Sequence, residues 1–81
     1  MTNLHINRWS ETLRQQTRTA LEQLVVSADG YIHFKHQLLG FATSAIEDLV
    51  YGRMVLKGKV DGKEYLFQNA DDLLQAGWAI D

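Results

Sequence analysis

Apolar side chains recur at steps of three and four residues over positions 7–27, NRWSETLRQQTRTALEQLVVS. This period, with Glu, Arg, Gln and Thr between the apolar positions, predicts an amphipathic N-terminal helix. The apolar members are Trp9, Leu13, Ala20, Leu21, Leu24 and Val25. The apolar stripe widens toward the C-terminal half, which we expect to pack more deeply. Asp29-Gly30 is the expected end of the helix, because glycine readily adopts the left-handed conformation.

Two shorter patterns follow this helix. Tyr31, Ile32 and Phe34 favour a short strand, although a polar run at positions 35–37 interrupts it. Residues 41–51, FATSAIEDLVY, predict a second helix that ends at Gly52. Its apolar face would hold Ala42, Ala45, Ile46, Leu49 and Val50. Its N-cap would be Thr43 or Ser44, with Glu47 completing a capping box with Ser44.

The pair Asp61-Gly62 predicts a β-hairpin with strands at about 53–60 and 63–68. A two-residue type I′ turn would make Val60 and Lys63 the flanking pair. The cross-strand pairs would then be Gly58 with Tyr65, Leu56 with Phe67 and Lys59 with Glu64. One face would be apolar, and the other would carry Lys57, Lys59, Glu64 and Leu66.

Asn69 is the expected N-cap of a short C-terminal helix that stops at Gly77. Asp72 sits where it can complete a capping box, and Asp71 lies where the helix dipole favours negative charge. Trp78 and Ile80 would then cover an edge of the sheet. The predicted fold is therefore α+β: a long helix, a second helix, a hairpin in a small antiparallel sheet and a short final helix.

The length of 81 residues predicts one domain covering positions 1–81. A chain this short buries only about 60–65% of its unfolded surface. It has no cysteine, so disulfides and thiolate metal sites are excluded as supports for the core. Self-association is the expected remedy.

Charge and hydropathy bear on the compartment and the partners. The formal net charge of −2 predicts no long-range attraction to nucleic acid or to an anionic membrane. No apolar run approaches the roughly 18–20 residues of a membrane span. The polar N-terminus, MTNLHINRWSETLRQQ, lacks the apolar segment of a signal peptide. We therefore expect a cytoplasmic, soluble protein.

No pattern of titratable residues predicts an active site, a metal site or a cofactor. His33 and His36 are three apart, so a strand would point them to opposite faces, and zinc needs three or four ligands. The acidic pairs at 47–48 and 71–72 lie on predicted helices, where neighbouring side chains diverge by about 100°. No nucleophile triad, phosphate loop or nucleotide fingerprint is present. We expect a non-enzymatic protein without a bound cofactor.

Basic residues leave a nucleic-acid-associated regulator open as an alternative. Arg14 and Arg18 lie one helical turn apart, and Lys57 and Lys59 lie on the hairpin. Acidic residues on the same elements dilute both groups. A second alternative is a small-ligand binder with a pocket lined by Trp and Tyr between helix and sheet.

Large apolar side chains outnumber what so small a fold can easily cover, which favours an interaction surface. The candidates for this surface are Trp9, Leu13, Leu66 and Trp78. The primary hypothesis is a small interaction module that forms a homodimer and binds another, unidentified protein. The segment 58–77 resembles the ends of short accessory proteins of phages and mobile elements, which implies an accessory or inhibitor role.

Overall fold

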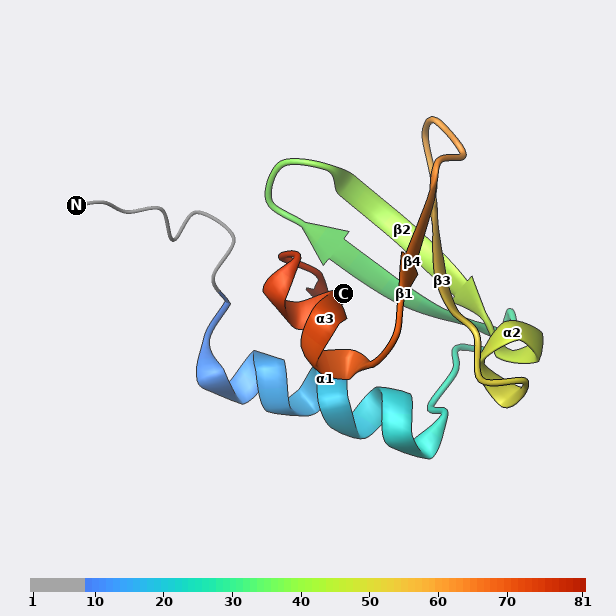
Figure 1. Cartoon of the computed structure of the whole chain (residues 1–81), viewed down its shortest axis with the longest axis horizontal. Coiled ribbons are helices and arrows are strands. Elements are labelled where there is room, and N and C mark those ends of the chain that lie inside the picture. The colour runs from blue at the N-terminus through green and yellow to red at the C-terminus, as the bar shows by residue number, and fades with distance from the viewer. Residues whose placement is uncertain (1–8) are drawn as a thin grey trace.

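The computed structural model describes residues 9–81. Its elements are α1 (Glu11–Gln23), β1 (Tyr31–His36), β2 (Gly40–Ala45), α2 (Ile46–Val50), β3 (Met54–Gly58), β4 (Glu64–Phe67), α3 (Ala70–Gln75) and β5 (Ala79–Ile80). The strands form one antiparallel sheet in the order β4-β3-β2-β1-β5. The predicted α+β class is confirmed. Figure 1 shows α3 beside α1, and two hairpins that diverge toward their tips.

The core lies on one face of the sheet, which we call the inner face. It is formed by Ile32 and Phe34 of β1, Ala42 of β2, Leu56 of β3, Leu21 of α1, Leu73 and Leu74 of α3, and Trp78. Because side chains alternate along a strand, the intervening positions point to the opposite face. The helices that supply core residues, α1 and α3, therefore cover the inner face.

α1 is shorter than the pattern over 7–27 predicted. Ser10 caps it, since the Ser10 hydroxyl accepts a hydrogen bond from the Leu13 N–H at 3.1 Å. The helix ends at Gln23, where Leu24 adopts the left-handed conformation with φ of 53°. The Val25 N–H then bonds the Ala20 carbonyl at 3.0 Å, a closure that satisfies the last helical turn. Thus Leu24, and not the expected Asp29-Gly30, stops the helix; positions 7 and 8 lie outside the described residues.

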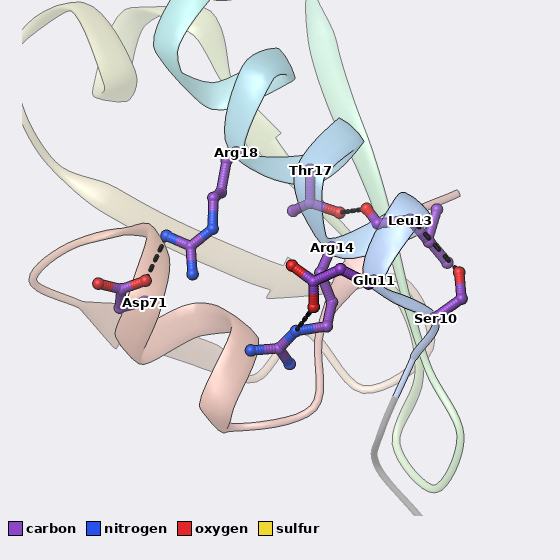
Figure 2. A network of polar contacts seen from close by, with 7 residues as sticks. All are labelled: Ser10, Glu11, Leu13, Arg14, Thr17, Arg18 and Asp71. Carbon is purple, nitrogen blue, oxygen red and sulfur yellow. Dashed lines mark hydrogen bonds and ion pairs between the residues drawn. The ribbon is translucent and has the colours of Figure 1, made fainter.

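Thr17 joins α1 to the C-terminal strand. Its hydroxyl donates to the Leu13 carbonyl at 2.8 Å and accepts from the Ile80 N–H at 3.1 Å. Figure 2 shows the bond from Thr17 to Leu13 within the helix. The Thr17 side chain is fully buried. The hydroxyl therefore satisfies a backbone donor of β5 and fixes α1 against this edge of the sheet.

The helix predicted over 41–51 is wrong in its first half, which is strand β2. Its inner-face residues, Ala42 and Ser44, are small, so the segment fits both a helical and a strand period. Pairing with β1 decides in favour of the strand. Ser44 is not a cap: its hydroxyl is buried and has no hydrogen-bond partner among the described residues. The helix that follows begins only at Ile46.

The predicted hairpin exists, but its register differs by two residues. Leu56 pairs with Tyr65, and Lys57 pairs with Glu64. A type I′ turn needs positive φ at both central residues, and here only Gly62 has it, with φ of 71°. Residues 59–62 instead form a longer loop, in which the Gly58 N–H bonds the Lys63 carbonyl at 2.8 Å.

This even shift keeps the strand residues on their predicted faces. Val60 is the exception, because it stands in the loop and is 97% exposed. It does not extend the apolar face as expected.

The N-cap and the end of α3 are confirmed. Asn69 Oδ1 accepts from the Asp72 N–H at 2.9 Å, and Gly77 has φ of 100° after the helix ends. Just beyond this helix, Ala76 bonds to the imidazole of His36. His36 Nε2 lies 2.8 Å from the Ala76 carbonyl oxygen, so it carries the proton and donates.

The other nitrogen of this buried imidazole holds the β1–β2 turn. His36 Nδ1 accepts from the N–H groups of Leu38 and Leu39 at 3.0 and 3.1 Å. The ring also packs against Trp78, with ring centroids 5.0 Å apart. One imidazole thereby connects the β1–β2 turn to the C-terminal end of α3.

Removing the Thr17 hydroxyl tests the attachment of α1. Thr17→Val keeps the shape but leaves the Ile80 N–H without its partner, so we expect a loss of about 1–2 kcal/mol in the free energy of unfolding. Urea denaturation followed by circular dichroism measures it. Thr19→Val on the exposed side of the same helix is the control and should change stability by less than about 0.5 kcal/mol. Equal effects of the two variants would contradict this role.

The buried Ser44 hydroxyl predicts a stabilising substitution. Ser44→Ala removes a polar group that has no partner and should raise the free energy of unfolding by about 1 kcal/mol. The matched Ser10→Ala variant loses the helix cap and should lower it by about 1 kcal/mol. Thermal unfolding of both variants measures the signs, and a destabilised Ser44→Ala protein would show that the hydroxyl has a partner.

Candidate interaction surface

The face of the sheet opposite the core, which we call the outer face, has no helix packed over it among the described residues. One row crosses four strands through the register pairs Glu64–Lys57, Lys57–Thr43 and Thr43–His33. The neighbouring row contains Phe41. The outer face therefore mixes polar, basic and aromatic groups at fixed positions.

Phe41 lies between two lysines. Lys35 is its register partner on β1. Lys59 follows β3 and donates its backbone N–H to the Phe41 carbonyl at 2.9 Å, with its ammonium 5.8 Å from the centre of the Phe41 ring. The ring is 49% exposed. Sequence reasoning missed this group because it assigned Phe41 to a helix.

The apolar candidates do not form one patch. Leu66 projects from the outer face of β4 and is 72% exposed. Trp78 is 1% exposed and belongs to the core. Trp9 and Leu13 are half-buried at the start of α1, and the Trp9 indole N–H donates to the Gly77 carbonyl at 2.8 Å. Of the candidate interface residues, only Leu66 is an exposed side chain.

The basic candidates lie on two different parts of the molecule. Arg14 is 3.9 Å from Glu11 on its own helix, and Arg18 forms an ion pair with Asp71 at the start of α3. Figure 2 shows both pairs on the helical side of the molecule. Lys57 and Lys59 lie on or beside the outer face. The structure therefore separates the two arginines from the two lysines.

Both histidines of β1 and the carboxylates of Asp29 and Asp48 have local partners. His33 and His36 point to opposite faces, as predicted, and His33 Nε2 lies 2.9 Å from Asp29 Oδ2. Asp48 is 2.7 Å from the guanidinium of Arg53. Within residues 9–81, no three His, Asp or Glu side chains gather where they could hold a metal ion.

An open groove of about 650 Å³ runs beside α1 near the β5 edge. Its lining residues are Glu11, Thr12, Gln15, Gln16, Thr19, Ala20, Val25 and Ile80. It contains neither Trp nor Tyr, so it is not the predicted ligand pocket. Tyr65 and Trp78 instead pack together, with ring centroids 5.3 Å apart.

Comparison with protein-family models, curated proteins and solved structures gives no match for this chain. In the part of the chain that the structure describes, no helix combines the length and the apolar character needed to cross a membrane.

Asp29 yields a prediction about pH. The backbone N–H of Tyr31 donates to its carboxylate at 3.0 Å, and with the neighbouring His33 this lowers the pKa of Asp29 below its ordinary value. The stabilisation is therefore present above the unfolded-state pKa and is lost as pH falls through the lower folded-state pKa. An NMR titration of the Asp29 carboxyl carbon should show the lowered pKa, and His33→Gln should remove only part of it. An unshifted titration would contradict this geometry.

Proposed function

We infer that this protein is a small, non-enzymatic, cytoplasmic interaction module that forms a homodimer through the β4 edge of its sheet. The observation that carries this proposal is the exposed Leu66 side chain on an edge strand. An edge strand offers backbone N–H and C=O groups to another chain. A marginal core also favours association.

The hairpin register shows which backbone groups are on offer. The bond from the Gly58 N–H to the Lys63 carbonyl marks a hydrogen-bonded pair. In an antiparallel ladder such pairs alternate with pairs that are not hydrogen-bonded. Glu64 and Leu66, which face Lys57 and Val55, fall in the second class. Their N–H and C=O groups therefore point away from β3, toward an incoming strand.

The opposite edge of the sheet is closed. Ile80 is the residue of β5 whose backbone N–H and C=O groups point away from β1. Its N–H donates to the hydroxyl of Thr17 on α1. The contrast supports β4 as the edge that receives a second strand.

Charge excludes one register for two β4 strands related by a twofold axis. Residues whose N–H and C=O groups point away from β3 must oppose each other in such a pair. Pairing centred on Glu64 would place two like charges together. Pairing centred on Leu66 places Leu66 against its copy and Glu64 against Gln68 instead. It also covers a hollow of about 330 Å³ lined in part by Met54, Phe67 and Gln68. This isologous arrangement closes as a dimer.

Leu66→Asp tests the dimer, because the proposed register then opposes two carboxylates and the dissociation constant should rise at least tenfold, since like charges cost several kcal/mol. Sedimentation velocity over a concentration series measures it. Val60→Asp adds the same charge at the loop tip, away from the β4 ladder, and should leave the dimer intact. A wild-type chain that sediments as a monomer at every concentration, or equal effects of both variants, would contradict the proposal.

A second, unidentified protein stays the expected partner of the dimer. The apolar side chains that could serve it lie on turns and on α2: Leu38, Leu39, Val50 and Tyr51 are all exposed. An accessory or inhibitor role would use such a surface, because inhibition by a non-enzymatic module requires occupation of a site on its target.

A further inference from the structure

The lysines of this chain are distributed differently from its arginines. Lysine occurs at positions 35, 57, 59 and 63, all on the sheet or its β3–β4 hairpin. In the described part of the chain, each arginine pairs with a carboxylate and no lysine does. The residues outside it, 1–8, include no Asp or Glu. Within residues 9–81 the lysine ammonium groups therefore have no carboxylate partner, and that of Lys35 lies 5.2 Å from the centre of the Trp9 ring.

Three of these lysines surround Phe41 on the outer face. Lys35 on β1 and Lys59, just after β3, flank it on its two sides, and Lys57 lies one row away, beside Thr43. Glu64 is the single acidic residue within the strands of the described chain. The lysines therefore outnumber the acidic residues within the strands, while Asp29 adds a carboxylate 2.9 Å from His33 Nε2 on the same face and the whole chain carries a net charge of −2.

We propose that the outer face binds single-stranded nucleic acid, with a base stacked on Phe41 and with backbone phosphates on Lys35, Lys57 and Lys59. An exposed aromatic ring offers a base a stacking surface, and a lysine offers a phosphate a point charge. Both kinds of group stand together here on a sheet face that none of the described helices covers.

The aromatic ring favours this ligand over other anions. A duplex keeps its bases stacked inside and offers Phe41 no base, whereas a single strand exposes one. An acidic peptide would use the ammonium groups but would leave the ring without a planar partner. The site differs from a stripe of Arg14 and Arg18, since both arginines are paired on the helical side.

This site does not depend on the dimer, because all its residues belong to one chain. Should the β4 edges pair as proposed, a twofold axis perpendicular to the sheet would bring both outer faces to the same side. A longer single strand would then contact two copies of Phe41.

Fluorescence anisotropy with labelled single-stranded oligonucleotides tests the proposal over a range of salt concentrations. Binding should weaken as salt rises, with a slope of about −2 in log K against log salt for the three lysine–phosphate contacts. A duplex of the same sequence should bind at least about tenfold more weakly, because it cannot stack on the ring.

Two substitutions separate stacking from charge. Phe41→Leu should weaken binding about tenfold and leave the salt slope unchanged. Lys35→Gln should reduce the slope by about 0.7. Lys63→Gln is the matched control, since alternation from Glu64 places Lys63 on the other side of the sheet; it should change the slope by less than about 0.3. Circular dichroism confirms that each variant is folded.

Three results would overturn the site: no binding at low salt, an unchanged affinity of Phe41→Leu, or equal binding of the duplex. Competition by polyglutamate as strong as by the oligonucleotide would also overturn it, because the face would then bind acidic protein segments. Sedimentation of the Phe41→Leu and Lys35→Gln variants distinguishes a failure of nucleic-acid binding from a failure of the dimer. Neither substitution should change the oligomeric state.

Discussion

The whole arrangement depends on how α1 is held against the C-terminal strand. The helices of residues 9–81 cover only one face of this small five-stranded sheet. The Thr17 hydroxyl fixes α1 there by accepting from the Ile80 N–H, while Arg18 pairs with Asp71 of α3. These contacts assign the inner face to the core and close the β5 edge. The proposed contacts would form on the remaining surfaces, the outer face and the β4 edge.

The sequence predicted those elements whose determinants are local. Asn69 as a cap needs only the Asp72 N–H three residues away. Alternation placed Leu66 on the outer face in both the predicted and the observed register, because the two differ by an even number of residues. The segment 40–45 failed because Ala42 and Ser44 are small enough for either period, and only the β1 ladder distinguishes them. The hairpin register failed because Asp61 uses its side chain, through a bond to the Lys63 N–H, and not a positive φ.

The candidate surface was predictable to a similar extent. Leu66 and the hairpin lysines followed from the strand pattern, whereas the position of Lys35 beside Phe41 required the pairing of β1 with β2. Alternation of Phe41 with the small Ala42 after Gly40 was the available signal. Trp78 was wrongly predicted at the surface. Its size alone suggested an interface, whereas the fold uses this ring to fill its core.

The imidazole of His36 makes the two hairpins unequal as sites for engineering. An extra residue in the β1–β2 turn would move the Leu38 and Leu39 N–H groups away from Nδ1 and leave a buried nitrogen without donors. At Val60 the side chain stands in solvent, and a longer loop costs only a little closure entropy. A tag or a grafted peptide therefore belongs at the tip of the β3–β4 hairpin, although both turns lie at the surface.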